Sequence, residues 1–477
     1  MNKDIPLITL LNCKSGKYIY DTNTNTILKV DEKVFECLKE VEKIGFYKYI
    51  EKSNEDNKVI NTIIRMHKEG FLCSSNIEKL SHPVSNFIYD YLENGVNGLI
   101  LQVTQNCNLK CRYCSFACDE TILNRDHSEK IMSWEIAKGA LDFLHKHSKN
   151  TKLLSIGFYG GEPLIETNLI EKCIEYTKKI FFDKVLTFNI TTNGTIMNSK
   201  ILKLLKDNNV NLLVSLDGPK EIHNINRRYF INGKGSFEKV YENLMFIKNN
   251  DYEYFKTIKF NSVIELDNDK VRDVVDFFTL DDVTKDNEYQ LTLVSDNFIN
   301  INYSETKEFL CAKETYIFKN LINYLSGKSF SYDFNYLDNL KSLAQAISYE
   351  KKLPKEYHNY GSCIPGHLRL HIDVDGLFRP CEKVSEKSNE MIIGNLNDGF
   401  NYEKIHKQLN YGFTKFLNCK NCWAIRLCQM CSNNFDYFGE DKKTYFEEKC
   451  AMEKRNIREA LECLLILKEC GVNLKYE

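Results

Sequence analysis

Apolar and polar residues follow a regular pattern from about residue 98 onward. Six short apolar runs, each typical of a buried strand, are separated by five segments whose apolar residues have helical spacing. The expected strands are GLILQVT, LLSIGFYG, LTFNITTN, NLLVSLDG, IKFNSVIEL and YQLTLVS, and the expected helices span 134–147, 167–181, 198–208, 236–249 and 268–279. This alternation predicts a parallel sheet with right-handed crossovers, either a partial barrel or a doubly wound sheet. In both architectures, functional residues gather at the carboxyl ends of the strands.

The first 75 residues show a different pattern. Three extended segments, IPLITLL, KYIYDT and TILKV, precede an amphipathic helix that Asp31 is expected to cap. A second helical pattern follows and ends at Gly70. This order of strands and helices predicts a small winged-helix-like module. A polar stretch interrupted by Pro83 comes next and predicts a linker with one short helix.

Periodicity is lost between residues 356 and 450, as expected of a loop-rich segment that metal organises in place of a large core. An amphipathic helix is expected from Glu453 to about Lys468. The predicted α/β chain therefore has a winged-helix-like module over 1–80, a linker over 81–97, a β/α sheet over 98–300, a helical bridge over 301–355, the loop-rich segment over 356–455 and a C-terminal helix over 456–477.

Composition and charge exclude several classes of function. Lysine and arginine total 64 against 66 aspartates and glutamates, so no strong positive field exists to bind nucleic acid. The N-terminal apolar run is too short for a signal peptide, and no apolar run is long enough to predict a transmembrane helix. We therefore expect a cytoplasmic protein with no nucleic-acid or membrane partner. Its 18 cysteines would remain reduced, which makes the clustered ones metal ligands or catalysts.

Three cysteines follow the first strand of the alternating region. Cys107, Cys111 and Cys114 are spaced so that one loop can wrap three thiolates around a four-iron, four-sulfur cluster. The fourth iron is then open to a ligand that is not protein. A zinc site is the alternative at this point, with Cys118 as the fourth ligand.

The motif C-x-x-x-C-x-aromatic-C at this position resembles the radical S-adenosylmethionine (SAM) superfamily. Motifs at the next three strand ends are similar to that family's in the same order: Gly160-Gly161-Glu162-Pro163, Thr191-Thr192-Asn193-Gly194 and Ser215-Leu216-Asp217-Gly218, with Arg227 shortly after. The resemblance implies a partial (β/α)6 barrel in which SAM chelates the open iron. It also implies SAM contacts at Gly160, Gly161 and Glu162 for the amino group, at Thr192 and Asn193 for the ribose, at Ser215 and Arg227 for the ribose or carboxylate, and at Tyr113 for the adenine, with Asp217 as a further cofactor-binding residue.

A second group of seven cysteines resembles the SPASM extension of radical SAM peptide-modifying enzymes. The resemblance implies two auxiliary [4Fe-4S] clusters, one ligated by Cys419, Cys422, Cys428 and Cys450 and the other by Cys363, Cys381 and Cys431. The second set lacks a fourth cysteine, so it has either an open iron or a distant ligand. A zinc ribbon is the alternative for the two C-x2-C pairs. Glu382 matches an acidic residue proposed as the substrate base in some relatives, and a solvated glutamate is the alternative.

These resemblances together imply an enzyme with SAM and three [4Fe-4S] clusters that abstracts hydrogen from a ribosomally made, cysteine-rich precursor peptide. The peptide's leader is expected to add a strand to the edge at 26–30, beside a helix near 57–69. Ferredoxin or flavodoxin is the expected electron donor. A thioether is the expected product, with carbon–carbon crosslinking or formylglycine formation as alternatives. A non-catalytic zinc or iron–sulfur scaffold is the alternative outside the enzymes.

Overall fold

The structure is a computed structural model, and it divides the chain into two compact units. It describes residues 4–53, 57–114, 116, 127–264, 268–293, 315, 317–319, 321–322, 324–326, 334–348, 350, 352–358, 363–410, 418–436, 442–472 and 474. The first unit combines Met1–Asn86, Leu337–Cys363 and His406–Glu477, and the second combines Phe87–Tyr336 and Ile364–Ile405. Cys118 and most of the predicted helical bridge lie outside the described residues.

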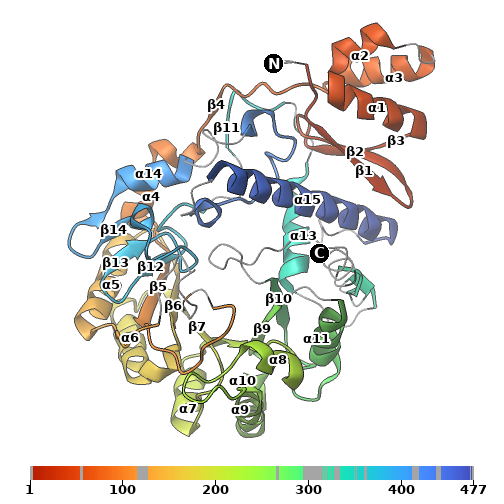
Figure 1. The fold of residues 1–477 in the computed structure, drawn as a ribbon. Coiled ribbons are helices and arrows are strands. Elements are labelled where there is room, and N and C mark those ends of the chain that lie inside the picture. Colours follow the sequence, from red (N-terminus) through yellow and green to blue (C-terminus); the bar gives the residue numbers. More distant parts are fainter. Residues whose placement is uncertain are drawn as a thin grey trace. The chain divides into compact units, whose positions relative to one another are not determined.

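The second unit is built on six parallel strands that lie side by side in chain order (Figure 1). They are β5 (Gly98–Thr104), β6 (Leu153–Gly160), β7 (Val185–Thr192), β8 (Asn211–Ser215), β9 (Lys259–Ile264) and β10 (Tyr289–Leu293). The connecting helices are α5 (Trp134–His147), α6 (Thr167–Ile180), α7 (Ser199–Asp207), α8 (Lys220–Asn226), α9 (Phe237–Asn250), α10 (Tyr252–Phe255) and α11 (Asn268–Leu280). All six predicted strands and all five predicted helices are confirmed. Because the strand order of these six strands never reverses, the sheet is not doubly wound. We call the second unit the barrel unit, after the partial barrel that the sequence predicts.

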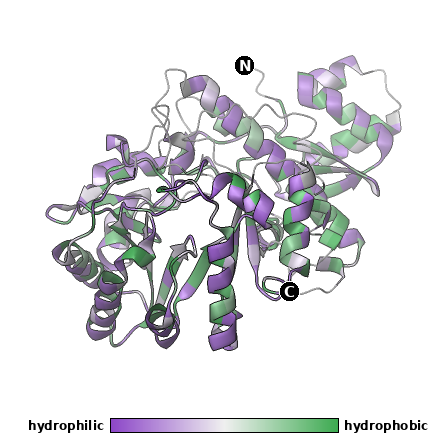
Figure 2. Cartoon of the chain, turned by 60° about the horizontal axis from the view of Figure 1, so that its bottom comes forward, coloured by the Kyte–Doolittle hydropathy of each residue, from purple (hydrophilic) through white to green (hydrophobic). Residues whose placement is uncertain are grey.

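The two faces of this sheet differ in chemistry. Leu99, Leu101 and Ile156 are fully buried on the face that the helices cover, where apolar side chains form the core. The alternate positions on the other face are small or polar, such as Gly157 and Asn189. Figure 2 shows helices with separate hydrophobic and hydrophilic stripes, as expected of helices packed on one side only. The chemically useful side chains therefore lie on the face away from the helices.

Residues 364–405 extend the same sheet. Strand β12 (Leu370–Ile372) pairs parallel with β5, and the short strands β13 (Leu377–Arg379), β14 (Gly394–Asn395) and β15 (Gly399–Phe400) continue it antiparallel. Cys381 and Glu382 directly follow β13, so both belong to the barrel unit. The sequence pattern had grouped this segment with the later cysteines. The short helix expected before the barrel is confirmed as α4 (Ile88–Asn94).

The first unit begins with an antiparallel sheet of β1 (Ile8–Cys13), β2 (Gly16–Asp21) and β3 (Thr26–Val30). Helices α1 (Glu32–Ile44), α2 (Phe46–Lys52) and α3 (Asn57–Lys68) follow. The Asp31 side chain accepts a hydrogen bond from the backbone N–H of Val34, which confirms the predicted cap. The β-then-α order of the module is also confirmed, although the pattern gave no sign of α2.

The C-terminal part of the first unit contains more helix than expected. It includes most of α13 (Phe334–Ala346), the second half of α14 (Tyr402–Asn410) and the long α15 (Lys442–Glu469). Strand β11 (Glu356–Tyr357) pairs with β4 (Lys79–Leu80) from the N-terminal segment. The closing helix begins at Lys442 and not at Glu453, so Cys450 lies on a helix. Leu461 and Leu465 of α15 share one core with Leu11 and Tyr20 of the N-terminal sheet. Within the described ranges, no helix is both long enough and apolar enough to cross a bilayer.

Candidate functional site

Cys107, Cys111 and Cys114 lie in the loop that follows β5, and the end of β6 holds this loop in place. The backbone N–H of Gly161 donates to the Thr104 carbonyl at 3.0 Å, and that of Glu162 donates to the Asn106 carbonyl at 2.9 Å. The Cys114 N–H donates to the Cys111 carbonyl and closes a turn. The cysteine loop is therefore attached to the glycine motif by backbone bonds.

The two glycines are required by this close approach. A Cβ on Gly160 would lie 2.0 Å from the Thr104 carbonyl oxygen, and one on Gly161 would lie 2.1 Å from that of Asn106. Gly160 also has a φ of +145°, which disfavours other residues. The motif was expected to bring backbone near SAM. The structure shows that it brings the end of β6 against the cysteine loop.

We predict that Gly161→Ala displaces the cysteine loop and loses the metal site. The new methyl group would meet the Asn106 backbone, which carries the chain into Cys107 and cannot rotate away as a side chain can. After anaerobic reconstitution, the variant should bind about four fewer irons per chain than the wild type. Gly139→Ala on α5 is the matched control, because a Cβ there meets only the Leu396 side chain, at an ordinary contact distance of 3.6 Å. Full iron content in Gly161→Ala would contradict this reading.

Glu162 connects the end of β6 to the end of β7 through hydrogen bonds. Its carboxylate is fully buried and accepts three hydrogen bonds, from the Leu164 and Asn193 backbone N–H groups and the Thr192 hydroxyl. Burial raises the pKa of Glu162, and these hydrogen bonds oppose the rise. The Asn193 amide in turn donates to Cys107 Sγ at 3.9 Å and to Asn108 Oδ1 at 2.8 Å. A single buried carboxylate thus positions a side chain that contacts a cysteine.

A buried ion pair lies beside the second cysteine. Arg227 Nε donates to Asp217 Oδ1 at 3.0 Å, and their side chains are only 7% and 1% exposed. The Tyr113 hydroxyl donates to the other Asp217 oxygen, and the Arg227 guanidinium lies over the Tyr113 ring. Arg227 Nη1 is 4.0 Å from Cys111 Sγ. Ser215, which ends β8, is also buried. Asp217 and Arg227, which follow β8, therefore contact Tyr113 and Cys111 of the cysteine loop.

The sequence did not indicate two histidine contacts. His127 Nε2 lies 3.8 Å from Cys114 Sγ, while its Nδ1 lies 3.1 Å from the Gln105 carbonyl. His223 Nδ1 accepts from the Asp217 N–H, and its Nε2 pairs with the Ser236 hydroxyl. Burial and the nearby arginine lower the pKa of His223, which is therefore neutral at neutral pH. Neither histidine belongs to a motif of the sequence: His127 lies 13 residues after Cys114, and His223 lies four residues before Arg227.

The donor set fits a [4Fe-4S] cluster with an open iron. Each of the three sulfurs has a side-chain nitrogen beside it, from Asn193, Arg227 or His127. Burial raises the pKa of Cys107 to about 12, so its thiolate needs a cation such as iron. In the described part of the chain, no three His, Cys, Asp or Glu side chains converge on one ion. A cluster makes no such demand, because each of its cysteines binds a separate iron.

In the first unit, the structure brings Cys419, Cys422, Cys428 and Cys450 together. All four pack against one apolar cluster, and burial raises the pKa of Cys419 to about 12, with Cys422 and Cys450 adding to the rise. The Lys454 ammonium hydrogen-bonds to Cys422, which favours the thiolate. Of the other predicted set, Cys363 and Cys431 lie in the first unit and Cys381 in the second. That ligand set stays a prediction.

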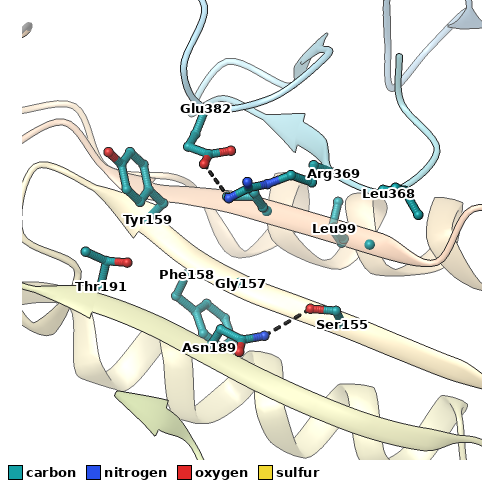
Figure 3. A pocket seen from close by; sticks show the side chains of 12 residues that line it. Leu99, Ser155, Gly157, Phe158, Tyr159, Asn189, Thr191, Leu368, Arg369 and Glu382 are labelled. Carbon is teal, nitrogen blue, oxygen red and sulfur yellow. Dashed lines mark hydrogen bonds and ion pairs between the residues drawn. The ribbon is translucent and has the colours of Figure 1, made fainter. Parts of the chain in front are cut away.

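Glu382 lines a cavity of about 130 Å³ on the open face of the barrel sheet (Figure 3). Only 8% of its side chain is exposed, and Oε1 accepts from the Arg369 guanidinium. Oε2 is buried and has no hydrogen-bond partner among the residues that the structure describes. The cavity is also lined by polar side chains, including Ser155, Tyr159, Asn189 and Thr191. Glu382 is therefore paired with Arg369 and is not a freely exposed surface glutamate, and its role as a base stays a prediction.

Comparison with known proteins agrees with this geometry. The sequence profile of the Radical SAM superfamily matches residues 101–278. The chain is 27% identical over 429 residues to the radical SAM cyclopropyl synthase TigE of Paramaledivibacter caminithermalis, covering 85% of this chain and 83% of that protein. It is 26% identical over 383 residues to the cysteine-type anaerobic sulfatase-maturating enzyme of Clostridium perfringens, covering 73% and 95%.

A solved structure shows the same fold. Native anSMEcpe with bound AdoMet superposes with a TM-score of 0.55 at 22% identity, covering 76% of this chain and 99% of that one. The superfamily profile covers the strands that carry the cysteine, glycine, asparagine and aspartate motifs, where the three thiols and their nitrogen partners meet. This chain is a radical SAM enzyme related to the SPASM-type peptide maturases.

Proposed function

We propose that this enzyme modifies a ribosomally made precursor peptide by forming a new bond at one of its carbon atoms. The observation that carries the proposal is the cysteine loop, in which each sulfur has its own nitrogen partner. The relatives support the choice of substrate. The named enzymes are a cyclopropyl synthase and a sulfatase-maturating enzyme, and anSMEcpe has been solved with bound AdoMet and a Kp18Cys peptide.

The chain's own residues prepare the site. Cys107, Cys111 and Cys114 would hold the cluster, and SAM with this cluster supplies the radical that removes a hydrogen atom. Arg227 keeps a positive charge beside Cys111, which stabilises the thiolate there. Its Nε is already bound to Asp217, so only its remaining N–H groups are free to meet the SAM carboxylate. The Tyr113 hydroxyl donates a hydrogen bond to Asp217, and the Tyr113 ring would contact the adenine.

Glu382 would contact the peptide. Glu382 lines the cavity and Arg369 balances its charge, so a neutral hydroxyl, thiol or amide group of the peptide would bind there without adding a second cation. The role of Glu382 as the substrate base rests on the family resemblance. Loss of peptide turnover in Glu382→Gln, with SAM cleavage unchanged, would support it.

The auxiliary clusters complete the proposal. Cys419, Cys422, Cys428 and Cys450 would hold one cluster, and Lys454 would place a positive charge beside it. That charge favours the reduced, more negative state, which suits a cluster that accepts the second electron from the peptide. Cys363, Cys381 and Cys431 would hold the other cluster. An open iron in that cluster is the reason for proposing a thioether product.

The relationship to TigE favours a second product, a carbon–carbon bond. The reconstituted enzyme, SAM and the peptide encoded by the neighbouring short reading frame would be incubated and analysed by mass spectrometry. Both products lose two hydrogens, but only a thioether also removes a free thiol, which alkylation would count. Formylglycine would appear as an aldehyde. An unchanged peptide together with normal SAM cleavage would contradict the proposed function.

We predict that the leader of the peptide binds along β3. This strand pairs only with β2 on one side, and among the described strands none pairs with its other edge. Added precursor should slow hydrogen exchange of the amides of residues 26–30, because an added strand would hydrogen-bond to this edge. The amides of β1, at the far edge of the sheet, are the internal reference. Equal protection of both strands, or of neither, would contradict this prediction.

A further inference from the structure

A rigid surface surrounds the cysteine loop of the barrel unit. The loop that carries Cys107 and Cys111 is joined to a hairpin over residues 228–235. The Lys110 N–H donates to the Arg228 carbonyl at 2.8 Å, and the Phe230 N–H donates to the Asn108 carbonyl at 3.0 Å. A bridge between Leu109 and Tyr229 adds a further connection. The hairpin and the cysteine loop therefore form one surface, which we call the cationic tip: residues 108–112 and 228–234.

The cationic tip concentrates positive charge. Lys110, Arg112, Arg228 and Lys234 are all exposed, and neither 105–114 nor 226–236 contains an acidic residue. Within the described part of the chain, Lys110, Arg228 and Lys234 form no ion pair, and the Arg228 guanidinium donates only to backbone carbonyls. The whole chain has a net charge of -2, so this charge is a local feature. It would attract an acidic partner and steer its approach.

Two large apolar side chains lie between Arg228 and Lys234 in the hairpin. Phe230 is 68% exposed and Ile231 is 93% exposed. Gly233 has a φ of +65°, which allows the tight turn that presents them. An apolar centre with a charged rim is the usual composition of a protein–protein interface. The pair is costly to leave in water, which favours a protein partner over a small ion.

We propose that the cationic tip docks an acidic flavodoxin, which reduces the cluster held by Cys107, Cys111 and Cys114. Lys110 and Arg112 flank Cys111 in the chain, so a protein bound here lies against a cluster ligand. The apolar pair would contact the exposed dimethylbenzene edge of the flavin. One electron passes from the flavin hydroquinone anion, which becomes the neutral semiquinone, to the cluster, which goes from the 2+ to the 1+ state. No proton is exchanged.

The test uses the full-length holoenzyme and separates electron delivery from SAM cleavage. Lys110→Glu/Lys234→Glu reverses two exposed charges that contact no motif residue through their side chains. Formation of 5′-deoxyadenosine is measured with increasing amounts of reduced flavodoxin of net negative charge, and separately with dithionite. The control variant Lys172→Glu/Lys203→Glu makes the same change of charge at exposed positions on α6 and α7. Iron content and the affinity for oxidised flavodoxin are measured for each protein.

The KM for flavodoxin should rise about tenfold or more in the tip variant, because electrostatic steering contributes factors of this size. The rate with dithionite and the iron content should not change, and added salt should reduce the difference from wild type. Phe230→Ser should also weaken flavodoxin binding, but without altering its salt dependence.

Three results would overturn the proposal. The first is an unchanged KM for flavodoxin in the tip variant, and the second is an equal loss with dithionite, which would mean that the site itself was damaged. The third is a loss of affinity for the precursor peptide with flavodoxin kinetics intact, which would assign this surface to the peptide. The proposal depends on SAM cleavage alone, so its failure would leave the peptide chemistry untouched.

Discussion

Cys111→Ala is expected to remove the SAM-binding cluster and to abolish 5′-deoxyadenosine formation. Each cysteine of the loop would hold a separate iron, so no neighbouring thiolate can replace the missing one. Cys111 is also the sulfur nearest to the Arg227 guanidinium, at 4.0 Å from Nη1. Without the thiolate, that buried guanidinium keeps Asp217 as its ion-pair partner but loses the negative charge beside Nη1.

The measurements for Cys111→Ala are iron content, the electron paramagnetic resonance signal of the reduced protein, and 5′-deoxyadenosine by chromatography. About four irons should be lost, and the auxiliary signals should remain. Cys173→Ala is the matched control, because Cys173 is a fully buried core residue of α6, distant in sequence from either cysteine group. A Cys111→Ala protein that still cleaves SAM would disprove the assignment of this loop.

Asp217→Asn is expected to destabilise the barrel unit by about 3–5 kcal/mol, because it leaves the buried Arg227 charge without its partner. The Asp217 carboxylate also accepts the Val263 N–H at 3.1 Å and the Tyr113 hydroxyl, so the substitution disturbs β9 and the cysteine loop together. Hydrogen exchange at Val263 should accelerate by roughly a hundredfold or more at this cost. SAM binding should weaken as Tyr113 loses its hydrogen bond.

The control for Asp217→Asn is Glu238→Gln, which breaks an ion pair with Lys220 in the same unit. Both of those side chains are about half exposed, and pairs of this kind contribute little to stability. Exchange at Val263 should therefore stay at the wild-type rate. If Asp217→Asn behaves like Glu238→Gln, the buried pair does not organise the site as described.

The strands and helices of the barrel were predictable because each has a strong period. Leu99 and Leu101 alternate toward the helices, and each motif follows the end of a strand. Strand β12 was not predictable, because three residues carry no periodic signal and its partner β5 is about 270 residues away. Cys381 belongs to the barrel unit because of that pairing, so its position could not be predicted from the sequence either.

The motifs identified the residues of the site, but they did not predict all the groups of the chain that these residues contact. The resemblance implies SAM contacts at Glu162 and Arg227, which stay a prediction; it gave no sign that Glu162 binds three donors of its own chain or that Arg227 pairs with Asp217. His127 contacts Cys114 from outside any motif. Such contacts depend on how loops pack in space, and spacing along the chain does not encode them.

The core that Leu11 and Tyr20 share with Leu461 has a consequence for biosynthesis. The Tyr18 hydroxyl also donates to Glu469, 451 residues later in the chain. At about 5–20 residues per second, a ribosome takes about 20 to 90 seconds to make the intervening chain. During that time the N-terminal sheet exposes apolar surface that is covered only by later parts of the chain, namely Ile347, Leu427 and finally the last helix. The nascent chain is therefore expected to need a chaperone at its N-terminal end until synthesis is nearly complete.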